Sequence, residues 1–124
     1  MAWLSDSTGT PNMRFTQSTV PYALVNGVEI ASSYADLTAP NYPYARVELD
    51  ASGNYAGAVT DNVFSNTDEL GNILSTTNHC SNFTSTSGIT TIGSFDSDVF
   101  WTRNYADNCD GSVYSGFHLY CFEQ

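Results

Sequence analysis

Lysine is absent from this chain of 124 residues, and three arginines stand against thirteen acidic residues, which gives a formal net charge of −10. A negative field of this kind repels nucleic-acid phosphates and anionic lipid headgroups. We therefore expect no nucleic-acid partner and no binding to an anionic membrane surface.

Long apolar runs are also missing, since no stretch reaches the about 18 apolar residues of a membrane-spanning helix. The first residues, Met1–Asp6, have neither the basic start nor the apolar stretch of a signal peptide. Ser, Thr, Asn and Tyr are nevertheless abundant, and all three cysteines lie towards the C-terminus, as in many secreted or surface proteins. We therefore expect an extracellular or cell-surface location without direct membrane insertion.

Helical periodicity and internal repeats are absent, and no segment predicts a helix longer than about two turns. The apolar fraction of 41% and the aromatic fraction of 14% are typical of a globular protein and not of a disordered one. A chain of this length forms one domain with a workable core. The sequence therefore predicts a single, mostly β domain over residues 1–124.

The clearest local signal is the pair Asn26-Gly27, which separates the strand-like segments Tyr22–Val25 and Val28–Ala31. Asn and Gly are the residues that most readily adopt the two positive φ angles of a type I′ turn. The sequence therefore predicts a β-hairpin with a two-residue loop at this point.

Shorter patterns predict the other elements. We expect a strand at Met13–Gln17 and one helical turn at Ser33–Leu37. A second hairpin is expected from Ala45–Leu49, through the turn Asp50–Gly53, to a partner strand that starts at Asn54. A further strand is expected at Val59–Phe64. Ser65–Gly71 is predicted to be an acidic, turn-rich loop. From Thr76 to Asn108 the pattern weakens, which predicts long loops, and binding residues usually lie on such loops.

The closing segment His118–Phe122 is apolar or aromatic on both alternating faces, as in a strand that is buried on both sides. Chain ends fray unless they are held by the rest of the fold. We therefore expect this segment to lie inside the sheet, between earlier strands, and to close the fold.

Separate motifs follow one another along most of the chain: Trp3-Leu4-Ser5-Asp6, Pro21–Ala31, Ala35-Asp36-Leu37, Cys80–Ser85, Trp101-Thr102, Cys109 and Leu119–Gln124. In this combination the chain resembles an uncharacterised bacterial domain family of the C-type-lectin-like fold, whose members occur on secreted or lipid-anchored surface proteins. The resemblance implies an α+β, β-rich fold with a small twisted antiparallel sheet and a long irregular loop region. It also implies that the opening helix of that fold is missing from this chain.

The resemblance assigns roles to the cysteines. Cys80 and Cys109 resemble the family's second disulfide pair, which ties the loop region to the strand before the end. The first pair joins the opening helix to the last strand, so Cys121 is expected to be unpaired or to link two chains. The alternative is that all three cysteines are reduced and buried as small hydrophobic side chains.

Calcium binding in lectins of this fold depends on Glu-Pro-Asn or Gln-Pro-Asp in the long loop and on Trp-Asn-Asp before the last strands. This chain has neither loop tripeptide, and its tryptophan motif, Trp101–Asn104, has Arg103 where an oxygen ligand would stand. Two further sets of oxygen ligands, without the spacing of a calcium loop, are Asp96 with Asp98, and Asp107 with Asn108 and Asp110. We therefore expect solvated loop acids, no metal or other cofactor, and calcium-independent binding.

Catalytic signals are weak. A hydrolase triad needs Ser or Cys beside His, and the only histidines are His79 and His118, without a G-x-S-x-G motif. Neither histidine belongs to a ligand-spaced pair, so we interpret both as structural or surface residues. Thirteen acids always offer carboxylate pairs for glycoside cleavage, but the sequence favours none. We expect no enzymatic activity, and a secreted hydrolase is the weakest alternative.

Aromatic residues near the C-terminus favour recognition, because they lie among Ser, Asn, Asp and Gly as in adaptable binding loops. Trp101 is expected in the core. The candidate ligand-binding residues are Phe95, Arg103, Asn104, Tyr105, Asp107, Asn108, Asp110, Tyr114 and Phe117.

We therefore predict an extracellular or surface ligand-binding module, similar to a receptor tip or adhesin, whose partner is a protein or glycan on another surface. The main alternative is a structural or assembly subunit of a surface filament or phage-like particle. Self-association would then use Cys121 or a neighbouring domain.

A further hypothesis concerns the segment between Cys80 and Cys121, which has no Lys, Gln, Glu or Met. A diversity-generating retroelement, which mutates the adenines of loop codons, leaves this kind of gap in residue usage. On this hypothesis related gene copies differ at exposed loop positions: Asn104, Tyr105, Asp107, Asn108, Tyr114 and Phe117. Trp101, Leu119 and Cys121 would then stay fixed.

Overall fold

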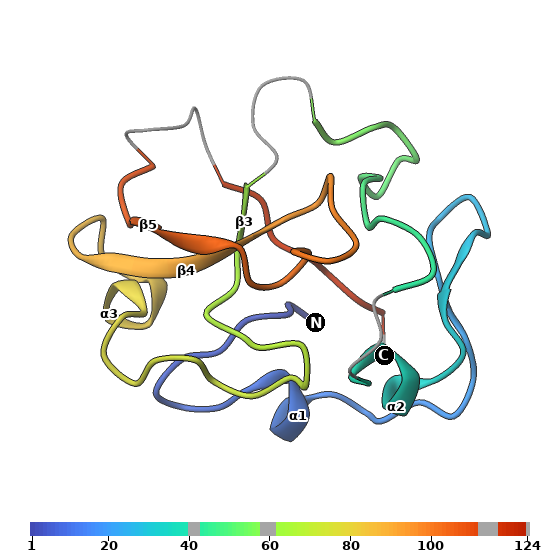
Figure 1. Ribbon diagram of the computed structural model, residues 1–124, viewed down its shortest axis with the longest axis horizontal. Coiled ribbons are helices and arrows are strands. Elements are labelled where there is room, and N and C mark those ends of the chain that lie inside the picture. Colours follow the sequence, from blue (N-terminus) through green and yellow to red (C-terminus); the bar gives the residue numbers. More distant parts are fainter. Residues whose placement is uncertain (40–42, 58–61, 112–116, 124) are drawn as a thin grey trace.

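The computed structural model describes residues 1–39, 43–57, 62–111 and 117–123 as a sheet-rich α+β fold (Figure 1). Its elements are α1 (Pro11–Arg14), β1 (Tyr22–Ala23), β2 (Glu29–Ala31), α2 (Tyr34–Leu37), β3 (Asn62–Phe64), α3 (Cys80–Phe83), β4 (Ile89–Ser94) and β5 (Tyr105–Asn108). They form two antiparallel sheets, β1-β2 and β3-β4-β5, which lie at opposite sides of the view in Figure 1. None of the helices in the described ranges has the length and apolar character needed to cross a membrane.

The larger sheet has β4 at its centre. Ile92 of β4 lies opposite Phe64 of β3 on one side and opposite Tyr105 of β5 on the other. The prediction of long loops from Thr76 to Asn108 is therefore wrong for two segments, since β4 and β5 both lie within it. A Cβ atom at Gly93 would lie 1.9 Å from the Trp101 carbonyl oxygen, so only glycine fits at this position of β4. Glycine weakens the strand pattern in the sequence, and this is why the strand was missed.

The predicted hairpin of β1 and β2 is present, but its turn differs from the prediction. The Gly27 N–H donates to the Leu24 carbonyl at 2.8 Å, and the Leu24 N–H donates to the Val28 carbonyl at 2.8 Å. Gly27 has a φ of 86°, whereas Asn26 is not among the residues with positive φ. The loop therefore has three residues, with the glycine alone in the left-handed region, and the two-residue type I′ turn is wrong.

Two other local predictions are confirmed. The Ser33 side chain accepts a hydrogen bond from the Asp36 N–H and caps α2. Asp50 Oδ1 accepts from the N–H groups of Ser52 at 2.8 Å and Asn54 at 2.9 Å, and Leu49 bridges Tyr55 across this turn. The turn therefore forms as predicted, although the segment before it joins no named strand.

The predicted strand Met13–Gln17 is wrong, because α1 occupies its first part. Pro11 stands at the first helical position, where its fixed φ favours a helix and its missing N–H costs nothing. The Phe15 N–H closes the turn on the Pro11 carbonyl at 2.9 Å. For the predicted strand Val59–Phe64, residues 59–61 lie outside the described ranges, and the remainder forms β3.

The closing segment lies between β3 and the N-terminal residues. His118 pairs in parallel with Val63, and Cys121 pairs in antiparallel with Ala2. Tyr120 and Phe122 are buried, whereas Leu119 is 49% exposed and Cys121 is exposed. The segment therefore docks between earlier parts of the chain, as predicted, but through isolated bridges and not as a strand of either named sheet. The predicted burial of both faces is wrong, because only alternate side chains enter the core.

Trp3 is fully buried at the centre of an aromatic core. Its ring centroid lies 4.8 Å from that of Trp101, 5.6 Å from that of Phe15 and 6.0 Å from that of Phe122. These rings come from both ends of the chain and from the segment between β4 and β5. The prediction that Trp101 belongs to the core is confirmed, since it is 1% exposed.

A network of buried hydroxyl groups lies against this core. The indole N–H of Trp3 donates to Thr102 Oγ1 at 2.7 Å. Thr102 Oγ1 also lies 2.8 Å from Ser65 Oγ and 2.9 Å from the Thr67 carbonyl oxygen. Thr67 Oγ1 shares a hydrogen bond of 2.8 Å with Ser5 Oγ. The network satisfies polar groups that have no access to water, and it ties three distant segments together.

Replacement of Thr102 by Val tests this network. It keeps the shape of the side chain but leaves the Trp3 indole N–H and the Ser65 hydroxyl without their buried partner. We expect a loss of about 2 kcal/mol in the free energy of unfolding, measured by urea denaturation. Thr86→Val, at an exposed position, is the matched control and should change stability by less than about 0.5 kcal/mol. Equal effects of both variants would contradict the role of the network.

The loop before α1 is organised by one carboxylate. Asp6 Oδ1 accepts from the Thr8 N–H at 2.7 Å and from Arg14 Nη2 at 2.6 Å. Partial burial raises the pKa of Asp6, but the hydrogen bonds from Thr8 and the Arg14 charge outweigh it and hold this pKa below its ordinary value. The ionised carboxylate is therefore preferred in the folded state.

This preference predicts a pH dependence. Because the pKa of Asp6 is lower in the folded than in the unfolded chain, its stabilisation is complete above about pH 4 and is lost as the pH falls through the folded value. Asp6→Asn should therefore lower the melting temperature at pH 7, and the difference from the wild type should shrink towards pH 3. Asp98→Asn removes the same charge from an exposed side chain and is the control. A gap for Asp6→Asn that stays constant with pH would refute the assignment.

Candidate functional site

The predicted contact residues gather mainly on and beside β5. Arg103 and Asn104 precede this strand, Tyr105, Asp107 and Asn108 belong to it, and Asp110 follows it. No described strand lies beyond β5 in the order β3-β4-β5, so β5 is an edge of the sheet. One edge strand therefore presents six of the nine candidates.

The exposed members of this group differ in how firmly they are held. Arg103 Nη2 pairs with Glu69 Oε1 at 3.2 Å, and the Tyr105 hydroxyl donates to Asn62 Oδ1 at 3.2 Å. Asn104 and Asn108 are exposed, and their side chains take part in no hydrogen bond among the described residues. The two asparagines are therefore the positions best able to contact a ligand without loss of internal bonds.

Asp107 corrects the expectation of a solvated loop acid. Only 8% of it is exposed, because it faces the sheet opposite Thr90 of β4. Its Oδ1 atom accepts from the Asn108 N–H at 2.7 Å. Its Oδ2 atom is buried and has no hydrogen-bond partner, and the same holds for Thr90 Oγ1. The two oxygens without hydrogen-bond partners thus belong to residues that lie opposite each other in the register of β4 and β5.

Three candidates do not join this group. Phe95 is 1% exposed and packs edge-on against His118, with ring centroids 5.2 Å apart, so the prediction of a contact residue is wrong. Its aromatic ring packs in the core instead. Phe117 is half-buried on Phe64, with centroids 4.1 Å apart. Tyr114 lies outside the described residues.

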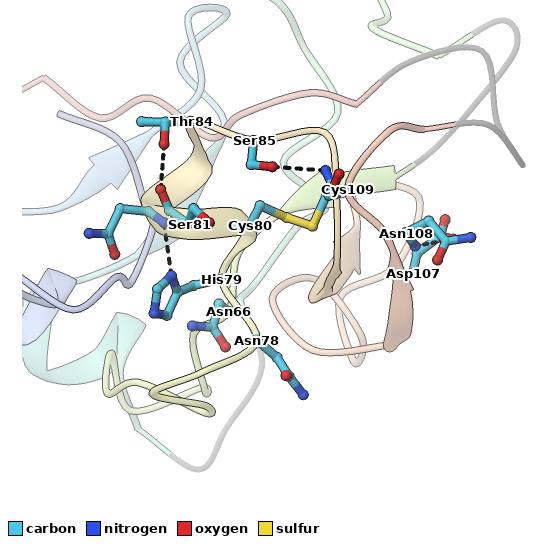
Figure 2. The surroundings of a disulfide bond; sticks show 12 residues. Asn66, Asn78, His79, Cys80, Ser81, Thr84, Ser85, Asp107, Asn108 and Cys109 are labelled. Atoms are coloured by element: carbon cyan, nitrogen blue, oxygen red, sulfur yellow. Dashed lines mark hydrogen bonds between the residues drawn. A yellow bond between two sulfur atoms is a disulfide. The ribbon is translucent and has the colours of Figure 1, made fainter.

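A disulfide holds the end of β5 to α3. Cys80 and Cys109 are bonded, as the resemblance implied, and the alternative of three reduced thiols is wrong (Figure 2). Both cysteines are buried, whereas Cys121 is free and exposed. The bond fixes the residue that follows Asn108, and so fixes where the exposed edge ends.

The turn α3 is left-handed. Its four residues, Cys80–Phe83, all have positive φ, between 51° and 59°. Each such residue costs about 1–2 kcal/mol when it is not glycine, so the surroundings must stabilise the turn. The N–H of Phe83 donates to the His79 carbonyl at 2.8 Å, and Thr84 Oγ1 donates to the Ser81 carbonyl at 2.6 Å.

His79 gives the turn its side-chain cap (Figure 2). Its Nδ1 atom accepts from the Asn82 N–H at 2.8 Å, and its Nε2 atom lies 3.0 Å from the Thr76 carbonyl oxygen. With Nδ1 as the acceptor, Nε2 is placed to donate to the Thr76 carbonyl. The interpretation of His79 as structural is confirmed, and His118, which packs on Phe95 and pairs with β3, is structural as well.

Among the described residues, no group of three or more His, Cys, Asp or Glu side chains is placed to hold a metal ion. Asp96 Oδ1 instead pairs with Arg46 at 2.5 Å, and Asp98 Oδ1 accepts from the Val99 N–H at 2.9 Å.

Sequence reasoning missed Asn62 and Thr90. Asn62 shares its face of the sheet with Thr90, and its Nδ2 atom is also buried without a partner. Thr90 stands in a segment predicted to be a loop, so no strand alternation marked its inward direction. Only the register of β4 against β5 reveals that it faces Asp107.

The thiols provide a direct test of this arrangement. The unreduced protein should show one free thiol per chain that reacts in the folded state, and Cys121→Ser should show none. A mass measurement without reductant separates the free thiol from a dimer linked through Cys121. Reduction of the disulfide between Cys80 and Cys109, which are 29 positions apart, should lower the free energy of unfolding by about 3 kcal/mol. Three reactive thiols in aerated protein would contradict the disulfide.

Comparisons of the chain with protein-family models, with curated proteins and with solved structures found no match. The functional proposal therefore depends on the residues and geometry of the chain itself.

Proposed function

We propose that this chain is an extracellular or surface ligand-binding module that binds through the exposed face and edge of β5 without calcium. One observation carries the proposal: exposed polar side chains stand between buried, cross-linked anchors. Asn104 and Asn108 are exposed, Trp101 and Thr102 before them are fully buried, and Cys109 after them is in the disulfide. A rigid frame of this kind presents contact residues at a low cost in conformational entropy.

The same separation supports the proposal of a diversified surface. Exposed side chains on a fixed backbone can change with little effect on stability, whereas buried ones cannot. Asn104 and Asn108 belong to the first class, and Trp101 to the second. Related gene copies that vary at the exposed positions and keep Trp101 would agree with a retroelement, and evenly scattered differences would contradict it.

The C-type-lectin-like fold remains part of this proposal. It is supported by the order of the sequence motifs, the disulfide between Cys80 and Cys109, and the docking of the closing segment between Val63 and Ala2.

An assembly subunit is the second candidate, and the surface around Cys121 favours it. The thiol is exposed, and Leu119 on the same outward face is 49% exposed. An exposed leucine beside a free thiol suits contact with a second chain.

A binding screen tests the first proposal. The protein is applied to arrays of surface proteins and glycans in the presence of EDTA, and captured ligands are tested against the double variant Asn104→Ala, Asn108→Ala. We expect the double variant to bind at least about tenfold more weakly, because it loses polar contacts at the centre of the surface. Its melting temperature should stay close to that of the wild type, since both side chains are exposed.

The matched control replaces two exposed asparagines outside β5, Asn26 and Asn72, with Ala. It should leave the affinity unchanged. Binding that survives the β5 variant, or that EDTA abolishes, would overturn the proposal.

A further inference from the structure

Among the described residues, no cation pairs with the carboxylate of Asp107. There is no lysine, and each of the three arginines is already bonded to another acid: Arg14 to Asp6, Arg46 to Asp96 and Arg103 to Glu69. His79 is engaged by Asn82 and Thr76, and the N-terminal ammonium by the Phe122 carbonyl. His118 packs its ring on Phe95.

The burial of this carboxylate is costly when it is left alone. Asp107 is 8% exposed, and its Oδ2 atom has neither a hydrogen-bond donor nor access to water. An ionised carboxylate in that position is destabilising unless a donor or an opposite charge reaches it. In the described part of the chain, the one donor to this carboxylate is the Asn108 N–H, and it binds the other oxygen, Oδ1.

Thr90 places a second unpaired oxygen beside it. Thr90 and Asp107 are directly opposite in the register of β4 and β5, so their side chains lie on the same face, with Cβ atoms about 5 Å apart. The two oxygens do not bond to each other, because both are without partners. A group with several N–H donors and a positive charge can satisfy both, whereas calcium needs about six to eight oxygen ligands.

We propose that Thr90 and Asp107 form a subsite for a positively charged nitrogen group, the ammonium of a lysine or the guanidinium of an arginine, presented by a partner protein. The subsite rests on the proposed function, because Asp107 lies in β5 beside the contact residue Asn108, and the contact residue Asn104 directly precedes this strand. The partner is therefore a protein with a basic surface. The net charge of −10 steers such a partner towards the chain.

The position of the subsite suits this role. No described strand lies beyond β5, so the edge of the sheet is the side from which a partner comes nearest to Asp107. Because Oδ2 has no access to water in the unbound chain, the incoming group has to displace the side chains that cover it. Tyr105 is two residues before Asp107, hence on the same face, and is 37% exposed. Its ring can contact the stem or the charge of the incoming side chain.

Nuclear magnetic resonance titration tests the subsite at low ionic strength. The probes are acetylated octapeptides that alternate Gly with Lys or Gly with Arg, and a peptide that alternates Gly with Gln is the uncharged control. We expect the basic peptides to shift the amide signals of Thr90, Asp107 and Asn108. Asp107→Asn keeps an oxygen for the Asn108 N–H and should weaken binding at least about tenfold. Asp98→Asn, with the same loss of charge at an exposed site, should weaken it less than about twofold.

Several results would overturn the inference. Equal losses in both Asp variants would indicate diffuse attraction to an acidic chain. Amide shifts confined to other regions would place the peptide elsewhere, and a crystal structure with peptide that keeps only a water between Thr90 and Asp107 would assign the gap to solvent. Spermine that binds as tightly as the peptides would assign the subsite to free polyamines. If Asp107→Asn does not fold, Thr90→Val is the second variant, and it should weaken binding severalfold.

The failure of this inference is distinguishable from the failure of the proposed function. Loss of ligand capture in the Asn104, Asn108 double variant, without any peptide shift at Asp107, keeps the binding module and removes the cationic partner. Peptide binding at Asp107, together with ligand capture that the Asn104, Asn108 double variant does not weaken, would keep the cationic subsite and remove the proposed contact surface at the two asparagines.

Discussion

The hydrogen bond from the Trp3 indole to Thr102 is the contact on which the other parts of the fold depend. It is made in the interior, where the indole has no water as an alternative partner, so its loss leaves the indole N–H buried and unsatisfied. Thr102 also meets Ser65, which follows β3, and its neighbour Trp101 packs on Trp3. One side chain from the start of the chain thus fixes the positions at which β3 ends and the segment leading to β5 begins.

The position of the proposed binding surface also depends on that contact. The segment that enters β5 is anchored by Trp101 and Thr102, and the segment that leaves it is anchored by the disulfide at Cys109. The cost of the left-handed turn at the other end of this bond is offset by the cap from His79. The strained backbone of this turn therefore lies at the other end of the disulfide from the exposed asparagines Asn104 and Asn108.

Sequence reasoning predicted the features that one or two residues determine. The helical turn at Ser33–Leu37 and the turn at Asp50 depend on local hydrogen bonds, and the disulfide followed from family resemblance. It failed where tertiary contacts decide. β4 is held by its neighbours and by the close approach of Gly93 to Trp101, with only weak strand propensity of its own. Of the candidate site, the exposed asparagines were predictable, but the pairing of Thr90 with Asp107 depends on a register that no local pattern encodes.

The left-handed turn α3 reverses the usual preferences for substitution along a helix. Its backbone is the mirror image of an ordinary helical turn, so glycine, which weakens a normal helix, is the residue best suited to Ser81. β-Branched side chains, which ordinary helices tolerate, are the least compatible with its positive φ. A mutational scan of this turn would thus rank the amino acids in nearly the opposite order to a scan of α2. The handedness of the turn could then be inferred from the substitutions that it tolerates.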